Sequence, residues 1–243
     1  LPPLERLKTY SDSDIALQRC ANPPTAAPLL GHLRVCVAAL CRLVHVKSMA
    51  DTVRQVGFTE EAVAVVSEVI EARVVDKEND VRLTLAEQIA ELGDFYMKDG
   101  EVSGYNETVE MLLSQIGKLL TDKELTVRSA AGVALVSIAK GLTKEHLESP
   151  VLGMVLCLAH DESEDHRALA AQLLNDMAEA FGKDLCANFC VPELRSLAED
   201  PEFGVRKAAA RNMAHICRTI GQEVSEEKML PVFMQLSKDE IWG

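Results

Sequence analysis

An aspartate followed six residues later by an arginine recurs at nearly fixed intervals, and no other feature limits the fold of this chain as strongly. The pairs are Asp76/Arg82, Asp122/Arg128, Asp161/Arg167 and Asp200/Arg206, and Asp239 begins a fifth copy. Successive aspartates are separated by 46, 39, 39 and 39 residues. A nearly constant interval of this length indicates an array of similar structural units rather than one irregular domain.

Columns of residues aligned on the four arginines have the spacing of one helix face. Three and four residues after each arginine the chain holds leucine, alanine or glycine, and seven and ten residues after it holds leucine, isoleucine or methionine. Apolar residues at these offsets predict a helix with one buried stripe. Gly182 and Gly221 lie fifteen residues after their arginines, where a helix end favours a residue that tolerates positive φ.

A second apolar stripe precedes each aspartate. The residues six positions before the aspartates are Ile70, Ile116, Val155, Leu194 and Phe233. Pro192 and Pro231 each lie eight residues before an aspartate, where they fit the first turn of a helix or a bend. Each unit is therefore predicted to be a helix, a tight turn that contains the aspartate, and a second helix.

Two-helix units of about 40 residues are typical of HEAT-type and armadillo-type solenoids. Because one helix pair cannot bury its apolar stripes alone, neighbouring pairs stack around a continuous core. The aromatic content of only 4% suits stacked helices better than a β-sandwich. We therefore predict an all-α fold, a HEAT-repeat solenoid of stacked antiparallel helix pairs.

The array is expected to cover residues 48–243. Its repeats are predicted at about 60–97, 107–142, 145–182 and 184–221, with a shorter one at 226–243. The longer first step is attributed to a polar loop at 98–106. Residues 1–19 are predicted to form a partial helical repeat. Residues 20–47, which hold three prolines and then an apolar run, are predicted to be an irregular insertion.

The charge balance limits the partners of the chain. Its 25 Lys and Arg against 38 Asp and Glu give a net charge of −13, which repels nucleic acid and anionic membrane surfaces. Arg34 and Arg42 lie within the longest apolar stretch, 29–46, and disfavour a transmembrane helix. Seven cysteines without a CxxC pair indicate reduced intracellular thiols. The expected location is the cytoplasm, and the nucleus is left open as a further compartment.

The sequence contains no motif of an enzyme that we could identify: no phosphate-cradling glycine loop, no GxSxG and no HExxH. The stretch 159–166 holds two histidines and four carboxylates, but these residues fall in a predicted turn, where acidic side chains are ordinarily solvated. Cys186 and Cys190 share a helix face and are interpreted as small core residues. We therefore expect no catalytic residue, metal ligand or cofactor.

Two kinds of candidate site lie at the turns. The Asp/Arg pairs are interpreted as a structural ladder, in which an aspartate accepts hydrogen bonds from a neighbouring unit. The ladder comprises Asp76, Arg82, Asp122, Arg128, Asp161, Arg167, Asp200, Arg206 and Asp239. Phe203 and Trp242 each lie three residues after an aspartate. Each ring either contacts a partner or packs over the adjoining turn, and the sequence leaves both open.

The turn and helix residues carry a family resemblance. At fixed offsets, Pro192, Asp200, Val205 and Arg206 resemble the HEAT-repeat consensus of proline, aspartate, valine and arginine. The stretches 1–10, 203–210 and 220–231 are similar to the N-terminal HEAT block of the protein phosphatase 4 regulatory subunit 1 family, and 235–243 resembles that family's next turn. The scaffold subunit of phosphatase 2A is less similar, and 20–47 has no counterpart.

The resemblance implies a non-catalytic regulatory or scaffold subunit of a serine/threonine protein phosphatase. Such a subunit binds the phosphatase catalytic subunit and directs it to phosphoprotein substrates. Because the family's middle region and C-terminal HEAT block are missing, the chain is expected to be a fragment. An importin-like transport adaptor shares the fold, but such adaptors carry regularly placed tryptophan and asparagine pairs, and this chain has one tryptophan. A structural segment without a partner of its own is the third alternative.

Overall fold

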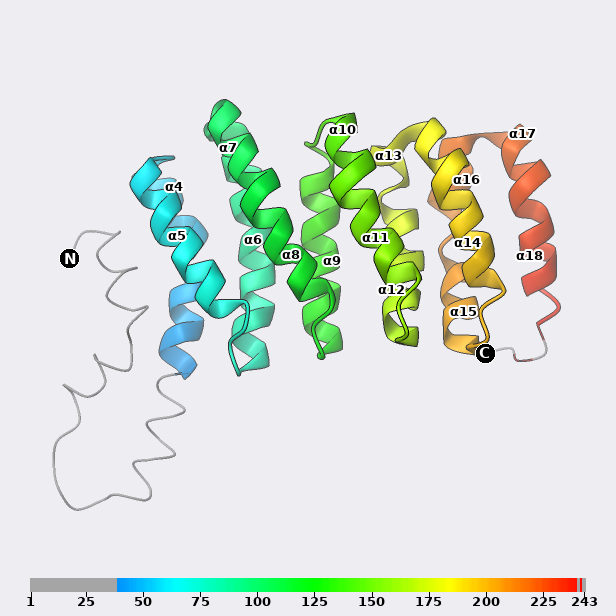
Figure 1. Ribbon diagram of the computed structural model, residues 1–243, viewed down its shortest axis with the longest axis horizontal. Coiled ribbons are helices and arrows are strands. Elements are labelled where there is room, and N and C mark those ends of the chain that lie inside the picture. The colour runs from blue at the N-terminus through cyan, green and yellow to red at the C-terminus, as the bar shows by residue number, and fades with distance from the viewer. Residues whose placement is uncertain (1–38, 240, 242–243) are drawn as a thin grey trace, which may run out of the picture. The chain divides into compact units, whose positions relative to one another are not determined.

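The computed structural model describes residues 39–239 and 241, and every regular element in this part of the chain is a helix (Figure 1). The chain divides into two compact units, with the boundary between Ala134 and Leu135. The prediction of an all-α array of helix pairs is confirmed. Of the predicted segments, 1–19 and most of 20–47 lie outside the described residues.

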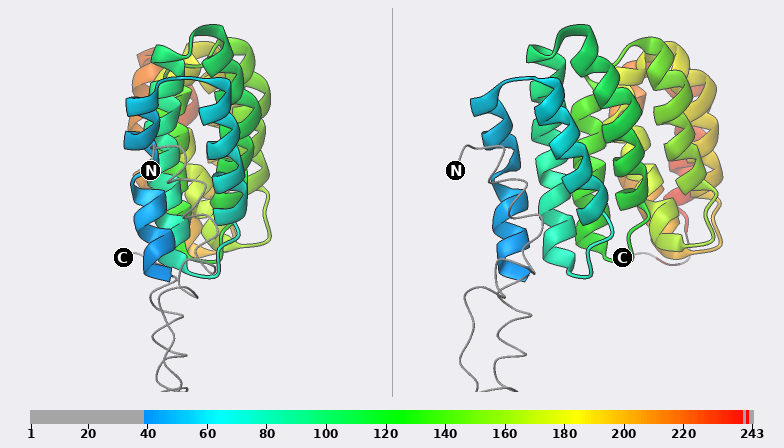
Figure 2. Two further views of the ribbon diagram at one scale, coloured as in Figure 1. Left: turned by 90° about the vertical axis from the view of Figure 1, so that its left-hand side faces the viewer. Right: turned by 60° about the vertical axis from the view of Figure 1, so that its left-hand side comes forward.

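The first unit consists of helix pairs arranged in two layers. Its elements are helix 39–47, α4 (Met49–Val56), α5 (Glu60–Arg73), α6 (Asn79–Asp99), α7 (Glu101–Glu107), η1 (Thr108–Leu112), α8 (Leu113–Leu120) and the beginning of α9 (Leu125–Ala139). The first helices of the pairs, α5 and α8, form one layer, and helix 39–47 and α6 form the other (Figures 1 and 2). The core lies between the layers, where Leu85, Ile89 and Ile116 are fully buried.

The second unit repeats the same arrangement. After the end of α9 its elements are α10 (Lys144–His146), η2 (Leu147–Val151), α11 (Leu152–Ala159), α12 (Glu164–Asp176), α13 (Ala178–Leu185), η3 (Cys186–Cys190), α14 (Val191–Ala198), α15 (Phe203–Arg211), α16 (Ala214–Ile220), α17 (Gln222–Val224), η4 (Ser225–Met229) and α18 (Leu230–Leu236). In Figure 1, α11, α14 and α18 form the layer of first helices, and α12 and α15 lie behind them. The buried stripe of the second helices includes Ala170, Leu174 and Ile216.

Residues 39–47 correct part of the predicted insertion. They form a helix that joins the first unit, and Arg42, His45 and Val46 are buried. Arg42 lies 40 residues before Arg82, close to the repeat interval, so this helix together with α4 is the second helix of a pair. The pattern was hidden because Cys36 stands where an aspartate precedes the other arginines.

The predicted polar loop at 98–106 is largely helical. Gly100 separates the end of α6 from α7, and α7 packs closely against α6. A Cβ atom added at Gly104 would collide with the carbonyl oxygen of Tyr96. Tyr96 is fully buried and meets the Phe58 ring edge-on, with the ring centroids 5.2 Å apart. The glycines of this segment therefore permit close helix packing rather than an open loop.

Glycines with positive φ end second helices at a fixed place. Gly57, Gly182 and Gly221 have φ values of 86°, 72° and 87°. Each lies fifteen residues after an arginine of the ladder series, if Arg42 is counted as a member. This conformation is strained for residues with a Cβ atom, which explains why glycine recurs there.

Four first helices contain a π-helical segment at the same position. The segments η1, η2, η3 and η4 begin at 108, 147, 186 and 225, so their interval is always 39 residues. In each, the amide after the segment donates to the carbonyl five residues earlier, as Val191 does to Cys186. Pro192 and Pro231 follow η3 and η4. A π segment accommodates one additional residue per turn of helix.

Second helices of adjacent pairs are also joined by single hydrogen bonds that do not repeat. Where helix 39–47 gives way to α4, the Ala50 amide donates to Oε1 of Gln88 at 3.0 Å. Where α15 gives way to α16, the His215 amide donates to Oδ1 of Asn175 at 2.8 Å. Both side chains are buried, so they satisfy amides that the helix breaks would otherwise leave unpaired.

Candidate functional site

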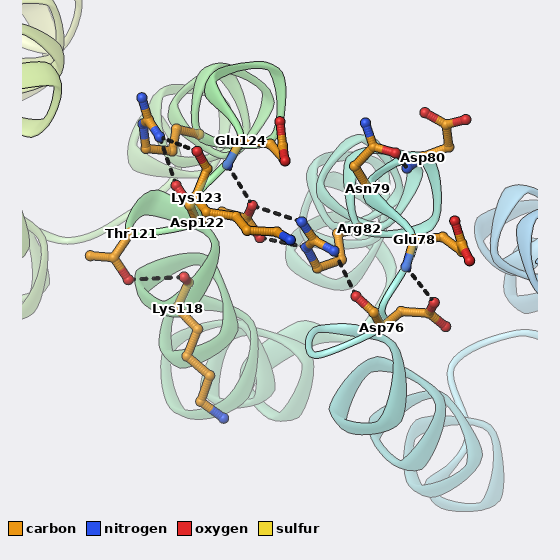
Figure 3. A network of polar contacts seen from close by, with 11 residues as sticks. Asp76, Glu78, Asn79, Asp80, Arg82, Lys118, Thr121, Asp122, Lys123 and Glu124 are labelled. Atoms are coloured by element: carbon orange, nitrogen blue, oxygen red, sulfur yellow. Dashed lines mark hydrogen bonds and ion pairs between the residues drawn. The ribbon is translucent and has the colours of Figure 1, made fainter.

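The ladder residues of the first unit bind one another in a continuous series (Figure 3). Arg82 donates from Nε and Nη2 to both carboxylate oxygens of Asp122, at 2.5 and 2.9 Å. Its Nη1 donates to the main-chain carbonyl of Asp76 at 2.6 Å. One guanidinium therefore joins the turn that precedes its own helix to the turn of the next pair. Arg42 makes the same bidentate contact with Asp76, at 2.7 and 3.1 Å.

The second unit repeats this geometry. Arg167 binds both carboxylate oxygens of Asp200 at 2.7 and 3.0 Å, and Arg206 binds those of Asp239 at 2.5 and 3.1 Å. The Nη1 atom of Arg206 also donates to the Asp200 carbonyl at 2.9 Å. Bidentate pairs of this kind fix orientation as well as adding energy.

Each ladder aspartate also closes its own turn. One carboxylate oxygen accepts the main-chain amide two residues later, at distances from 2.8 to 3.1 Å. The amide donors are those of Glu78, Glu124, Ser163, Glu202 and Ile241. Arg128 and Arg167 bond the carbonyls of the turns before their helices in the same way as Arg82. The turn residues are thus positioned by hydrogen bonds to side chains as well as by helix packing.

The carboxylates of the ladder are held in their charged form. Burial by itself raises the pKa of Asp122, but the hydrogen bonds from Arg82 and from the Glu124 amide outweigh it, and the pKa lies below its ordinary value. The pKa of Asp76 is lowered in the same way by Arg42. A carboxylate saturated by a guanidinium and an amide has little capacity for acid–base chemistry. The geometry is therefore that of a structural connection between pairs.

Phe203 lies at the first position of α15, beside an open cavity. The ring is partly exposed, and its centroid is 5.5 Å from Nζ of Lys207 and 6.0 Å from Cζ of Arg206. The cavity has a volume of about 530 Å³, and its lining includes Phe203, Lys207 and Lys238. The ring packs against cations of its own helix and still faces accessible space, so it retains the capacity to contact a partner. Trp242 lies outside the described residues.

A second concave surface was not recognised in the sequence. An apolar groove of about 270 Å³ lies between α16, η4 and α18, with Met229, Leu230 and Phe233 in its wall. Phe233 belongs to a column that the sequence predicts to be buried, yet it is 54% exposed, whereas Leu194 at the equivalent position is fully buried. In the preceding pair, α15 packs against α14 and covers that position. The described chain contains no second helix that follows α18.

His160, His166 and Cys186 of the second unit form contacts with neighbouring residues. His160 pairs with Glu193 at 3.3 Å, and His166 with Asp161 at 3.0 Å. The Cys186 thiol donates to the Ala178 carbonyl at 3.3 Å. Nowhere in residues 39–239 do three or more histidine, cysteine or carboxylate side chains gather as metal ligands would. None of the described helices has the length and apolar character needed to cross a bilayer.

The chain is similar in sequence to regulatory subunits of serine/threonine-protein phosphatase 4. It is 31% identical over 201 residues to serine/threonine-protein phosphatase 4 regulatory subunit 1 of Rattus norvegicus, which covers 81% of this chain and 21% of that protein. It is 26% identical over 122 residues to serine/threonine-protein phosphatase 4 regulatory subunit 4 of Homo sapiens, covering 50% and 14%. The chain thus spans about a fifth of the length of the first of these relatives. No protein-family model matches it.

Among solved structures, a designed armadillo repeat protein in complex with the peptide (KR)4 aligns with a TM-score of 0.46. The sequence identity is 21%, and the alignment covers 84% of this chain and 87% of that one.

Proposed function

Since this chain is homologous to the regulatory subunits of serine/threonine-protein phosphatase 4, we propose that it is a non-catalytic scaffold segment of such a phosphatase. In this role it binds the catalytic subunit and positions phosphoproteins for it. The observation that carries the proposal is 31% identity over 201 residues, which extends over most of the chain and its stacked helix pairs. The repeat fold supports it, because such stacks present extended surfaces for protein partners.

The mechanism of a scaffold is positional. A surface that holds the catalytic subunit and another that holds a substrate raise the effective concentration of each for the other. No proton transfer or nucleophile from the scaffold is needed. The ladder fixes neighbouring turns by bidentate contacts, so that the exposed faces of the helices keep a defined spacing.

The exposed face of α6 is the surface of the first unit that we assign to a basic region of the catalytic subunit. Glu87 and Glu91 are exposed one turn apart on this helix. Charge complementarity at such a face steers association and is screened by salt.

The test is light scattering after gel filtration of the chain mixed with purified phosphatase 4 catalytic subunit, at 100 and 500 mM salt. We expect a one-to-one complex that weakens at the higher salt. E87K is expected to weaken it, whereas E68K, which makes the same charge change at an exposed position of α5, is expected to have little effect. Glu91 is left unchanged because it pairs with Arg54 at 3.0 Å.

Two outcomes would contradict the proposal. The first is absence of a complex when the chain is folded and helical by circular dichroism. The second is hydrolysis of p-nitrophenyl phosphate by the chain alone, which would show catalysis.

A further inference from the structure

The second helix formed by α15 and α16 has a charge opposite to that of the whole chain. Residues 203–220 contain four Arg or Lys and no Asp or Glu, although the chain has a net charge of −13. Of the four cations, only Arg206 belongs to the ladder. The other three are free of that role and call for a separate explanation.

These cations lie on one face, which we name the basic stripe. It consists of the cations Lys207, Arg211 and Arg218 together with the polar His215, at successive spacings of four, four and three residues. Lys207 is partly exposed, and the other three are exposed. The opposite face of the same helices is the buried one, with Val205, Ala209 and Ile216 fully buried. The stripe therefore faces solvent.

Stacking of the repeats does not require cations at these positions. The equivalent positions of α6 are Glu87, Glu91 and Asp94, and those of α12 and α13 are Gln172, Asp176 and Glu179. The same columns thus accept either sign of charge. The same positions are Lys47, Asp51 and Arg54 in helix 39–47 and α4, and Val133, Ser137 and Lys140 in α9. Among the described pairs, only α15 and α16 hold arginine at both the first and the last of these positions, and a feature that stacking leaves free points to a role outside the stack.

The stripe is not neutralised by the neighbouring helices. None of the ion pairs between described residues of the second unit involves Arg211 or Arg218. On the adjacent second helix, Asp176 accepts from the amides of Gln172 and Asn175, at 3.4 and 3.2 Å. Glu179, the other carboxylate of that face, is exposed. The guanidinium groups of the stripe therefore remain available to an external carboxylate.

The Phe203 cavity adjoins one end of the stripe. Lys207 belongs to both, because its Nζ lies 5.5 Å from the Phe203 ring centroid and the residue lines the cavity. Leu236 and Ile241 add apolar wall to this cavity. A ligand that follows the stripe thus reaches a place for an apolar side chain.

We propose that the basic stripe and the Phe203 cavity bind an acidic peptide segment of a partner protein, with an apolar anchor followed by carboxylates at alternate positions. Lys207 and Arg211 lie four residues apart on α15, which displaces them by about 6 Å along its axis. Side chains on one side of an extended peptide repeat at about 6.7 Å. Alternate carboxylates of an extended segment therefore match Lys207 and Arg211, and Arg218 offers a further contact beyond the break between α15 and α16. This inference does not depend on the proposed phosphatase role.

The negative charge of the rest of the chain favours a short acidic peptide over nucleic acid as the ligand of the stripe. Nucleic acid carries a closely spaced row of phosphates that extends beyond any one helix, and a chain with a net charge of −13 repels it. A short peptide with a few carboxylates meets only the local positive field of the stripe.

The test is fluorescence anisotropy with the 243-residue chain and a fluorescein-labelled peptide, Trp-Gly-Glu-Ser-Glu-Ser-Glu-Ser-Glu. We expect saturable binding that weakens between 50 and 300 mM salt. R211E/R218E is expected to lower the affinity by about tenfold or more, because it replaces two attractive contacts by repulsive ones. The matched control K140E/K183E makes the same charge change at exposed lysines and is expected to alter the affinity by less than about threefold. Circular dichroism and thermal unfolding verify that both variants fold.

The cavity is tested separately. F203A is expected to weaken binding of the peptide with tryptophan. It is expected to leave unchanged the binding of a peptide in which glycine replaces the tryptophan. An equal loss of affinity in R211E/R218E and K140E/K183E would overturn the proposal, because the effect would then be that of net charge. Absence of binding to the carboxylate peptide would also overturn it. So would a preference for a phosphoserine peptide or for single-stranded DNA, each tested in a parallel titration.

Discussion

Replacing Asp122 by alanine leaves the guanidinium of Arg82 without its bidentate acceptor. The two side chains are 9% and 6% exposed, so water does not restore the lost hydrogen bonds fully. Removing one partner of such a buried pair typically costs about 3–5 kcal/mol. We expect D122A to lower the free energy of unfolding by about 3 kcal/mol, because Arg82 retains its bond to the Asp76 carbonyl.

The assay is urea and thermal unfolding followed by circular dichroism at pH 7. A loss of this size lowers the Tm by about 6–12 °C in a chain of this length. K98A is the control, because Lys98 and Asp94 form an exposed pair that is worth less than about 1 kcal/mol. In the double variant D122A/R82L, which removes both charges of this pair, we expect part of the stability to return. A D122A variant as stable as K98A would refute the reasoning that the ladder holds adjacent pairs together.

Three further predictions concern pH and glycine. The pKa values of the ladder aspartates of the first unit, Asp76 and Asp122, lie below the ordinary value, so the stability they contribute is present above about pH 4 and is lost as the pH falls further. Urea titrations between pH 2 and 7 measure this, and a free energy of unfolding independent of pH there would contradict it. Gly221→Ala is expected to destabilise by about 1–2 kcal/mol because its φ is 87°, whereas helical Gly153→Ala, where a Cβ atom meets open space, is expected to stabilise by up to about 1 kcal/mol. If both alanines shift the Tm in the same direction, that explanation fails. Gly104→Ala is expected to destabilise by about 2 kcal/mol or more, since the Cβ atom would collide with a main-chain carbonyl of α6, and a Tm equal to that of the unsubstituted chain would contradict it.

The array could be predicted from sequence because stacking constrains the same columns in every pair. Leu85, Ile89 and Leu92 follow Arg82 at the offsets of a buried stripe, and all three are fully buried. Where one member of the pattern was absent, the prediction failed. Arg42 has no aspartate six residues before it, so its helix was assigned to an insertion although its guanidinium makes the ladder contact.

Other features are invisible to a pattern of offsets. The glycines of 98–106 resemble turn residues, yet Gly104 allows α7 to approach α6. The π segments change the phase of the first helices by one residue without changing the composition of the chain. Burial of Phe233 depends on a covering helix, and its column alone does not say whether that helix is present. The basic stripe was missed because it becomes apparent only when its residues are compared with those at the equivalent positions of the other pairs.

The ladder makes the stack directional, in the manner of a polymer with two different ends. In each printed step an arginine donates toward the pair that follows and an aspartate accepts from the pair that precedes, so a reversed pair would find no complement; the arginines are Arg42, Arg82, Arg167 and Arg206. Because all steps are chemically equivalent, however, the ladder cannot distinguish one neighbour from another. Neighbouring pairs are distinguished by the hydrogen bonds that occur once, such as Gln88 with Ala50 and Asn175 with His215. The repeated contacts thus determine the orientation of the pairs, and the contacts that occur once determine their order.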